Sequence, residues 1–248
     1  MKALLLGSIG VVCDTSDLQR QAYNTAFTEA GLDWHWNTSL YKKILEIPGG
    51  TKRLARYAKE VASNDVDVES IHKRKTELYA QMLEESQQPL RSGVIRLVKA
   101  AQSKGIKVGW ITSTEFSNLE AILRRSAGQL SEADFDIITH RETVEKSKPH
   151  PAPYLSALEH LRIEACQAIA IEDTEACMHS AIGAGIPCIV TPHELSINQN
   201  FDEALSVVSG LGDTDSPEKM LGGISLFEQQ GLVTIEALSS LHEDVFNA

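Results

Sequence analysis

The chain has 248 residues, a length that fits one large domain or a core with a smaller inserted domain. Its composition, 42% hydrophobic and 23% charged, is typical of a globular protein and excludes a largely disordered chain. The 34 acidic and 23 basic residues give a formal net charge of -11, which disfavours nucleic acid and anionic membranes as partners.

The chain begins with an apolar run that predicts a buried strand. The run 3–6 is broken by Gly7 and Ser8, and no clear cleavage site follows, so a signal peptide is disfavoured. No apolar run in the sequence approaches the roughly 20 residues that span a bilayer. The four cysteines are scattered and form no CxxC pair, which favours free thiols in a reducing compartment. We therefore expect a cytoplasmic protein with no membrane partner.

Short apolar runs alternate with amphipathic stretches through most of the chain. The runs are continuous, as is typical of strands that are covered on both faces. This alternation predicts a parallel, Rossmann-like α/β sheet with right-handed crossovers. The predicted strands are 3–6, 108–111, 136–139, 168–171, 186–190 and 205–208; the predicted helices are 92–104, 115–126, 151–161, 174–184, 217–221 and 234–245.

The stretch from residue 15 to about residue 88 breaks this alternation. It contains no good strand, and its helical patterns cover 18–30, 40–45, 51–62 and 68–85. A helical insert of roughly 75 residues is too long for a crossover. We therefore predict a helical cap domain over 15–89 and a Rossmann-like core over 1–14 and 90–248.

Polar side chains follow several of the predicted strands. In an open parallel sheet, ligands bind outside the carboxyl ends of the strands. Thr112 and Ser113 follow one strand, Glu172 and Asp173 follow another, and Lys148 lies between them in the sequence. Hydroxyls and a lysine suit phosphate oxygens, and adjacent carboxylates suit a hard divalent ion such as magnesium. Together they predict a phosphate site at Thr112, Ser113 and Lys148, and metal ligands at Glu172 and Asp173.

Each of these residues also has an ordinary structural explanation. Thr112 and Ser113 suit the N-cap of the helix that begins near residue 115, and the segment 172–174 suits the N-cap of the next helix. Lys148 suits a solvated surface. The joint placement of the three groups at successive strand ends favours the phosphate site over these separate explanations.

Three features of the predicted cap and its neighbourhood attract weaker hypotheses. Lys52 and Arg53 suit either a substrate phosphate with its sugar hydroxyls or a solvated helix face. His35 lies between two tryptophans, which favours an aromatic cluster over a ligand site. Cys177 is expected to be a core residue and not a reactive thiol.

Several segments together resemble the haloacid dehalogenase (HAD) superfamily of phosphohydrolases with a cap of the phosphoglucomutase-like type. The resemblance runs over nearly the whole length and implies a magnesium-dependent sugar-phosphate hydrolase that acts through an aspartyl-phosphate. The segment 48–53 further resembles the CbbY-like branch, although Gln19 stands where that branch often carries histidine. The other resembling segments are 10–15 with 20–24, 111–113, 146–154, and 170–174 with 181–187.

The first motif departs from the family at its catalytic positions. The family has Asp-x-Asp-Gly, in which the first aspartate attacks phosphorus and the second is the general acid and base. Here the sequence is Gly7–Ser8–Ile9–Gly10. Gly7 has no nucleophile or metal ligand, Ile9 cannot transfer a proton, and Ser8 is predicted to point away from the site. We expect magnesium to bind weakly or not at all, and Gly7→Asp to strengthen its binding.

Three functions are therefore compatible with the sequence. The favoured one is a HAD-like protein that binds a sugar phosphate or another phosphorylated small molecule but is catalytically impaired. The alternatives are an active magnesium-dependent phosphatase and a non-catalytic scaffold or regulatory partner. The retained Thr112, Lys148, Glu172 and Asp173 favour ligand binding over a pure scaffold.

Overall fold

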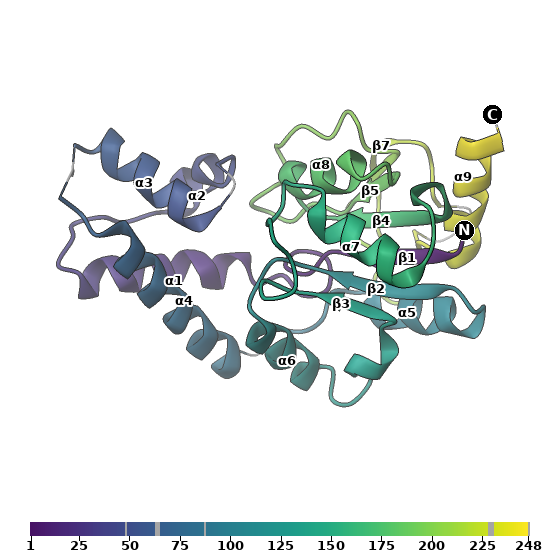
Figure 1. Cartoon of the computed structure of the whole chain (residues 1–248), viewed down its shortest axis with the longest axis horizontal. Coiled ribbons are helices and arrows are strands. Elements are labelled where there is room, and N and C mark those ends of the chain that lie inside the picture. Colours follow the sequence, from purple (N-terminus) through teal and green to yellow (C-terminus); the bar gives the residue numbers. More distant parts are fainter. Residues whose placement is uncertain (48, 63–64, 87, 228–230, 248) are drawn as a thin grey trace. The chain divides into compact units, whose positions relative to one another are not determined.

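The computed structural model describes residues 1–47, 49–62, 65–86, 88–227 and 231–247. The chain divides into two compact units, one formed by Met1–Asp14 with Pro89–Ala248 and the other by Thr15–Gln88. Each unit has its own elements, most of which are labelled in Figure 1. Pro48, part of the segment that resembles the CbbY-like branch, lies outside the described residues.

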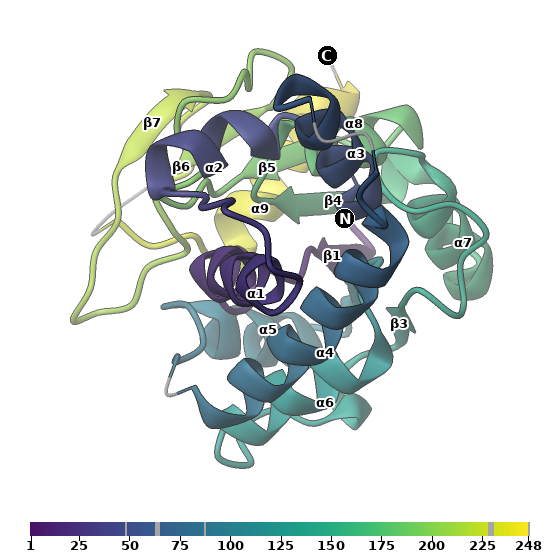
Figure 2. The same cartoon turned by 90° about the vertical axis from the view of Figure 1, so that its left-hand side faces the viewer.

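The larger unit is built on a single sheet with the strand order β3-β2-β1-β4-β5-β6-β7. Its strands pair in parallel except for β7, which runs antiparallel to β6. Figure 2 shows β7 at one side of the sheet and β3 at the other. The strands are β1 (Ala3–Leu6), β2 (Lys107–Ile111), β3 (Ile137–Thr139), β4 (Ala168–Glu172), β5 (Cys188–Val190), β6 (Ser206–Val208) and β7 (Met220–Gly223).

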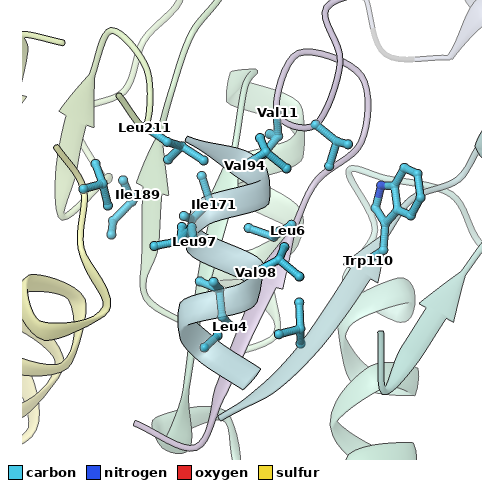
Figure 3. Close-up of a cluster of buried hydrophobic side chains, with 14 of the residues drawn as sticks. Leu4, Leu6, Val11, Val94, Leu97, Val98, Trp110, Ile171, Ile189 and Leu211 are labelled. Atoms are coloured by element: carbon cyan, nitrogen blue, oxygen red, sulfur yellow. The ribbon is translucent and has the colours of Figure 1, made fainter. Parts of the chain in front are cut away.

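Helices cover both faces of this sheet, which explains why its central strands are continuously apolar. On one face, α5 presents Val94, Leu97 and Val98 to Leu4 and Leu6 of β1 (Figure 3). The same core includes side chains of α6 and α9, and the core on the opposite face is formed with α7 and α8. These elements are α5 (Val94–Ser103), α6 (Phe116–Arg125), α7 (Ala152–Leu161), α8 (Glu175–Gly183), α9 (Ile235–Asn247) and the short 3-10 helices η1 (Glu132–Asp134) and η2 (Ala165–Gln167).

The smaller unit is helical. It contains α1 (Ser16–Glu29), α2 (Thr38–Leu45), α3 (Gly50–Glu60) and α4 (Val68–Glu85), and α1 packs along α4. Its core is the expected aromatic cluster, in which the ring centroid of Trp36 lies 4.6 Å from that of Tyr23 and 4.8 Å from that of Phe27. Aromatic side chains carry a large apolar area, so this small unit has a core of its own.

The predicted α/β class is confirmed, and one predicted element is wrong. The segment 217–221 was expected to be helical, but Met220–Gly223 forms the edge strand β7. Pairing with β6 decides this conformation. A segment of five residues is too short to form a stable isolated helix, and the two glycines that follow it do not favour one. Of the cysteines, Cys13 and Cys188 are buried, Cys177 is half-buried and Cys166 is exposed. Within the described ranges, no helix is long and apolar enough to cross a bilayer.

Candidate functional site

The parallel register brings the ends of the central strands to one edge of the sheet. Leu6 of β1 is aligned with Trp110 of β2 and with Ile171 of β4, while Glu172 is aligned with Val190 of β5. The residues that follow these positions therefore meet at the carboxyl edge, which is where open α/β sheets bind ligands.

Lys148 and Glu172 form a buried ion pair at this edge. The Lys148 side chain is 9% exposed and that of Glu172 is 1% exposed. Lys148 Nζ donates hydrogen bonds to Glu172 Oε1 and, at 2.8 Å, to the carbonyl oxygen of Ile111 at the end of β2. The Tyr154 hydroxyl on α7 donates to the same Oε1. Lys148 is therefore not a solvated surface charge, and one oxygen of Glu172 is fully engaged.

Burial and mutual attraction shift the pKa values of Lys148, Tyr154 and Glu172. Burial raises the pKa of Glu172, and the attraction of Lys148 opposes but does not cancel that rise. Burial alone would lower the pKa of Lys148, but the negative charge around it, from Glu172 first and also from Asp173 and Cys177, together outweighs burial, so this pKa is raised. Burial, reinforced by Glu172, raises the pKa of Tyr154 well above its usual value. Lys148 and Tyr154 therefore both keep their protons at neutral pH and direct them at Glu172.

Gly7 and Gly10 of the first motif each lie against an acidic side chain that would overlap a Cβ atom at that position. A Cβ built on Gly7 would overlap Glu172 Oε2 and lie 2.9 Å from Glu172 Cδ. Gly10 has a φ of +83°, and a Cβ there would lie 2.7 Å from the Cβ of Asp173. Glu172 therefore leaves no space for a side chain at position 7, and Asp173 leaves none at position 10.

Asp173 has a partner that sequence reasoning missed. His193, three residues beyond the end of β5, places Nε2 at 3.3 Å from Asp173 Oδ2, and both side chains are buried. Ser196 holds the backbone of Asp173 by a hydrogen bond of 2.7 Å to its carbonyl oxygen. No sequence motif marks His193, because the contact depends on the loop that follows β5.

The hydroxyl residues lie at the same edge but make local contacts. Thr112 is buried, and its Oγ1 accepts a hydrogen bond of 3.1 Å from the amide of Thr114. Ser113 Oγ accepts a hydrogen bond of 3.2 Å from the amide of Lys148, so the hydroxyl and lysine segments do meet. The N-cap residue of α6 is Glu115, which makes no side-chain capping bond. Thr174, by contrast, does cap α8 through the amide of Cys177.

The donors at this edge do not fit a magnesium ion. In the part of the chain that is described, the metal-ligand atoms that gather here belong to Glu172, Asp173 and Cys177, all within 4.8 Å of one another. Magnesium takes oxygen ligands in octahedral geometry, which a thiol does not suit. Gly7 offers no ligand, and one oxygen of each carboxylate already faces Lys148 or His193.

The smaller unit contains a buried lysine that sequence reasoning also missed. Lys75 on α4 is 6% exposed, and its Nζ donates a hydrogen bond to Gln19 Oε1 at 2.6 Å. The same nitrogen lies 4.9 Å from the ring centroid of Tyr23 and 5.0 Å from that of Tyr79. Burial, reinforced by repulsion from Arg53, lowers the pKa of Lys75 to about 7. None of the ion pairs in the described part of the chain gives Lys75 a carboxylate partner.

Lys52 and Arg53, the two cap residues predicted to contact a ligand, differ in burial. Lys52 is exposed on α3. Arg53 is buried, and its guanidinium donates hydrogen bonds of 3.1 Å to the carbonyl oxygens of Ile44 and Ile47, at and just beyond the end of α2. Neither explanation offered for Arg53 from the sequence included this role in joining α2 to α3. Its contact with a ligand stays a prediction.

Comparison with known proteins decides the family. The family profile described as haloacid dehalogenase-like hydrolase matches residues 10–191. The chain belongs to this family. Protein CbbY of Cupriavidus necator is 36% identical over 224 residues, which is 88% of each chain. The resemblance to the CbbY-like branch is thereby confirmed.

Two solved structures of CbbY from Rhodobacter sphaeroides have the same fold as this chain. One, in complex with phosphate, has a TM-score of 0.77 and 31% identity, covering 85% of this chain and 94% of its own. A mutant in complex with xylulose-(1,5)bisphosphate has a TM-score of 0.78 and 30% identity, covering 86% and 96% of the two chains. The chain is a HAD-like hydrolase similar to CbbY.

Proposed function

We propose that this protein binds a sugar phosphate or another phosphorylated small molecule and turns it over poorly or not at all. The observation that carries the proposal is the site at Gly7: the position that bears the attacking aspartate in the family has no side chain and no space for one. The same edge keeps the Lys148 and Ser113 groups that suit a phosphate.

Loss of catalysis follows from the residues that remain. Phosphoryl transfer in this family needs a nucleophile and an acid-base group, and Gly7 and Ile9 supply neither. Glu172 is not a substitute nucleophile, because its carboxylate is fully buried and is held by Lys148 and Tyr154. Ser8 is also buried. An active magnesium-dependent phosphatase is therefore the less favoured function.

Phosphate binding is supported by the groups that face the carboxyl edge. The loop between β2 and α6 carries Thr112 and Ser113, and α6 follows it, so backbone amides and a helix N-terminus are available to an anion. Lys148 adds an ammonium group there, which it shares with Glu172. The phosphate and xylulose-(1,5)bisphosphate complexes of CbbY support a ligand of the same chemical class.

We further propose that the unit 15–88 acts as a cap domain. Its exposed Lys52 and its buried Arg53 are the residues that we propose to serve the substrate. The free thiols favour a cytoplasmic location for the protein.

Phosphatase turnover by the purified protein is expected to be near background. Acid-base assistance alone contributes about 10²–10⁴-fold, so its loss together with the nucleophile should leave rates at least 100-fold below the roughly 1 per second of an ordinary enzyme. Release of inorganic phosphate from sugar monophosphates and bisphosphates, with magnesium present, measures this. A Ser8→Ala variant serves as the control for a substitute nucleophile. Turnover of about 1 per second or faster in the wild type would establish the active-phosphatase alternative.

Inorganic phosphate at millimolar concentration is expected to raise the melting temperature of the wild type by a few degrees, because a ligand that binds only the folded state stabilises it. Ser113→Ala should reduce this shift, since it removes a hydroxyl from the proposed anion site. Ser117→Ala is the matched control, because Ser117 is exposed on α6. If phosphate shifts neither the wild type nor the control, the scaffold alternative gains.

A further inference from the structure

Gly7 and Glu172 are in close contact at the carboxyl edge of the sheet. A Cβ on Gly7 would overlap Glu172 Oε2, lie 2.9 Å from Glu172 Cδ, and lie 3.0 Å from Cγ2 of Val11. Cβ atoms in real proteins do not approach other atoms at the first two of these separations. The glutamate carboxylate therefore lies where a side chain of residue 7 would begin.

The carboxylate is not free to swing aside. Its Oε1 accepts hydrogen bonds from Lys148 Nζ and from the Tyr154 hydroxyl, and the whole residue is 0% exposed. Its Oε2, which faces Gly7, has no hydrogen-bond partner in the part of the chain that is described. Moving the carboxylate would break the buried ion pair with Lys148, and leaving a buried charge unpaired is strongly destabilising.

We propose that Gly7 and Glu172 are a matched pair: the Glu172 carboxylate fills the volume that a side chain at position 7 would need, and Lys148 balances its charge in place of a divalent metal ion. The departure of the first motif from the family is thus accommodated by the geometry of the acidic motif. This inference is independent of phosphate binding, because it concerns contacts within the folded chain.

The pairing revises the expectation that Gly7→Asp strengthens magnesium binding. An aspartate at position 7 must displace the Glu172 carboxylate before it can reach any ion. Shortening Glu172 to aspartate withdraws that carboxylate by one methylene group and opens the space. A metal site can therefore be restored at this edge only by changing both residues together.

Thermal unfolding of four proteins tests the pairing: the wild type, Gly7→Ala, Glu172→Asp and the double variant. Alanine adds only the Cβ, so Gly7→Ala should lower the melting temperature by about 5 °C or more. The same substitution in the Glu172→Asp background should cost less than half of that shift, which is the non-additivity expected of residues in contact. Gly222→Ala is the matched control, because a Cβ there meets nothing closer than 3.9 Å. An equal loss in both backgrounds, or no loss in either, would overturn the proposal.

Titration calorimetry with magnesium chloride tests the consequence for metal binding. The wild type and Gly7→Asp should show no binding at millimolar magnesium, and the variant with Gly7→Asp and Glu172→Asp together should show binding. Magnesium binding by Gly7→Asp alone, as tight as by the double variant, would overturn the proposal. The phosphate-induced melting shift of the wild type is measured in parallel, so a failure of phosphate binding is distinguished from a failure of the Gly7–Glu172 pairing.

Discussion

Replacing Lys148 with methionine is expected to lower the free energy of unfolding by about 3–5 kcal/mol, the usual cost of removing one partner from a buried ion pair. The side chains of Lys148 and Glu172 are 9% and 1% exposed, so water cannot replace the lost partner. Methionine keeps the length of the lysine stem, so the loss reports the charge and its hydrogen bonds more than a cavity. Urea unfolding at pH 7 measures the effect.

Two variants make this result specific. Lys146→Met is the matched control, because Lys146 is exposed and lies two residues away in the same loop; its effect should stay within about 0.5 kcal/mol. Adding Glu172→Gln to Lys148→Met removes the stranded charge and should recover a large part of the loss. A cost for Lys148→Met no greater than that of the control would show that the ion pair does not exist.

The pH dependence of Lys148→Met has a definite sign. Burial raises the pKa of Glu172 above its unfolded value, and loss of Lys148 raises it further. A carboxyl group with a raised pKa in the folded state binds more protons when folded, so it lowers stability as pH rises above the unfolded pKa. The variant should therefore lose less stability relative to the wild type at pH 5 than at pH 7, as urea unfolding at the two pH values will measure.

Lys75 is expected to make the smaller unit less stable at pH 7 than at pH 9. Its pKa falls from 10.5 in the unfolded chain to about 7 in the folded one, mainly because burial disfavours the ammonium ion. The unfolded state then binds more protons between these two values, so stability rises with pH across this window. Each pKa unit corresponds to 1.36 kcal/mol, which gives an expected gain on the order of 2 kcal/mol between pH 7 and pH 9.

Lys75→Met should abolish this gain and stabilise the unit most at and below pH 7. Urea unfolding of wild type and variant at pH 6, 7, 8 and 9 gives the difference directly. A Trp110→Phe background leaves Trp34 and Trp36 as reporters of the smaller unit. Lys73→Met is the control, since Lys73 is exposed on the same helix. A stability difference between Lys75→Met and the wild type that does not change with pH would contradict a buried ammonium group at position 75.

Most of the framework of the protein was predictable from the sequence. Continuous apolar runs such as Ala3–Leu6 indicate strands that are buried on both faces, and this local signal survived in the fold because the covering helices have equally clear apolar faces. The edge strand Met220–Gly223 was not predictable, because its burial alternates weakly and its pairing partner β6 decides its conformation.

The residues of the site were only partly predictable, and the reason is physical. The order of polar groups after successive strands pointed to Ser113, Lys148, Glu172 and Asp173, because parallel strands deliver their carboxyl ends to one edge. Their contacts depend on loop paths and side-chain packing. The sequence shows that position 7 has no side chain. Only the tertiary structure shows that the Glu172 carboxylate fills the space beside Gly7. That contact joins the residue after β1 to the last residue of β4, which are 165 positions apart in the chain.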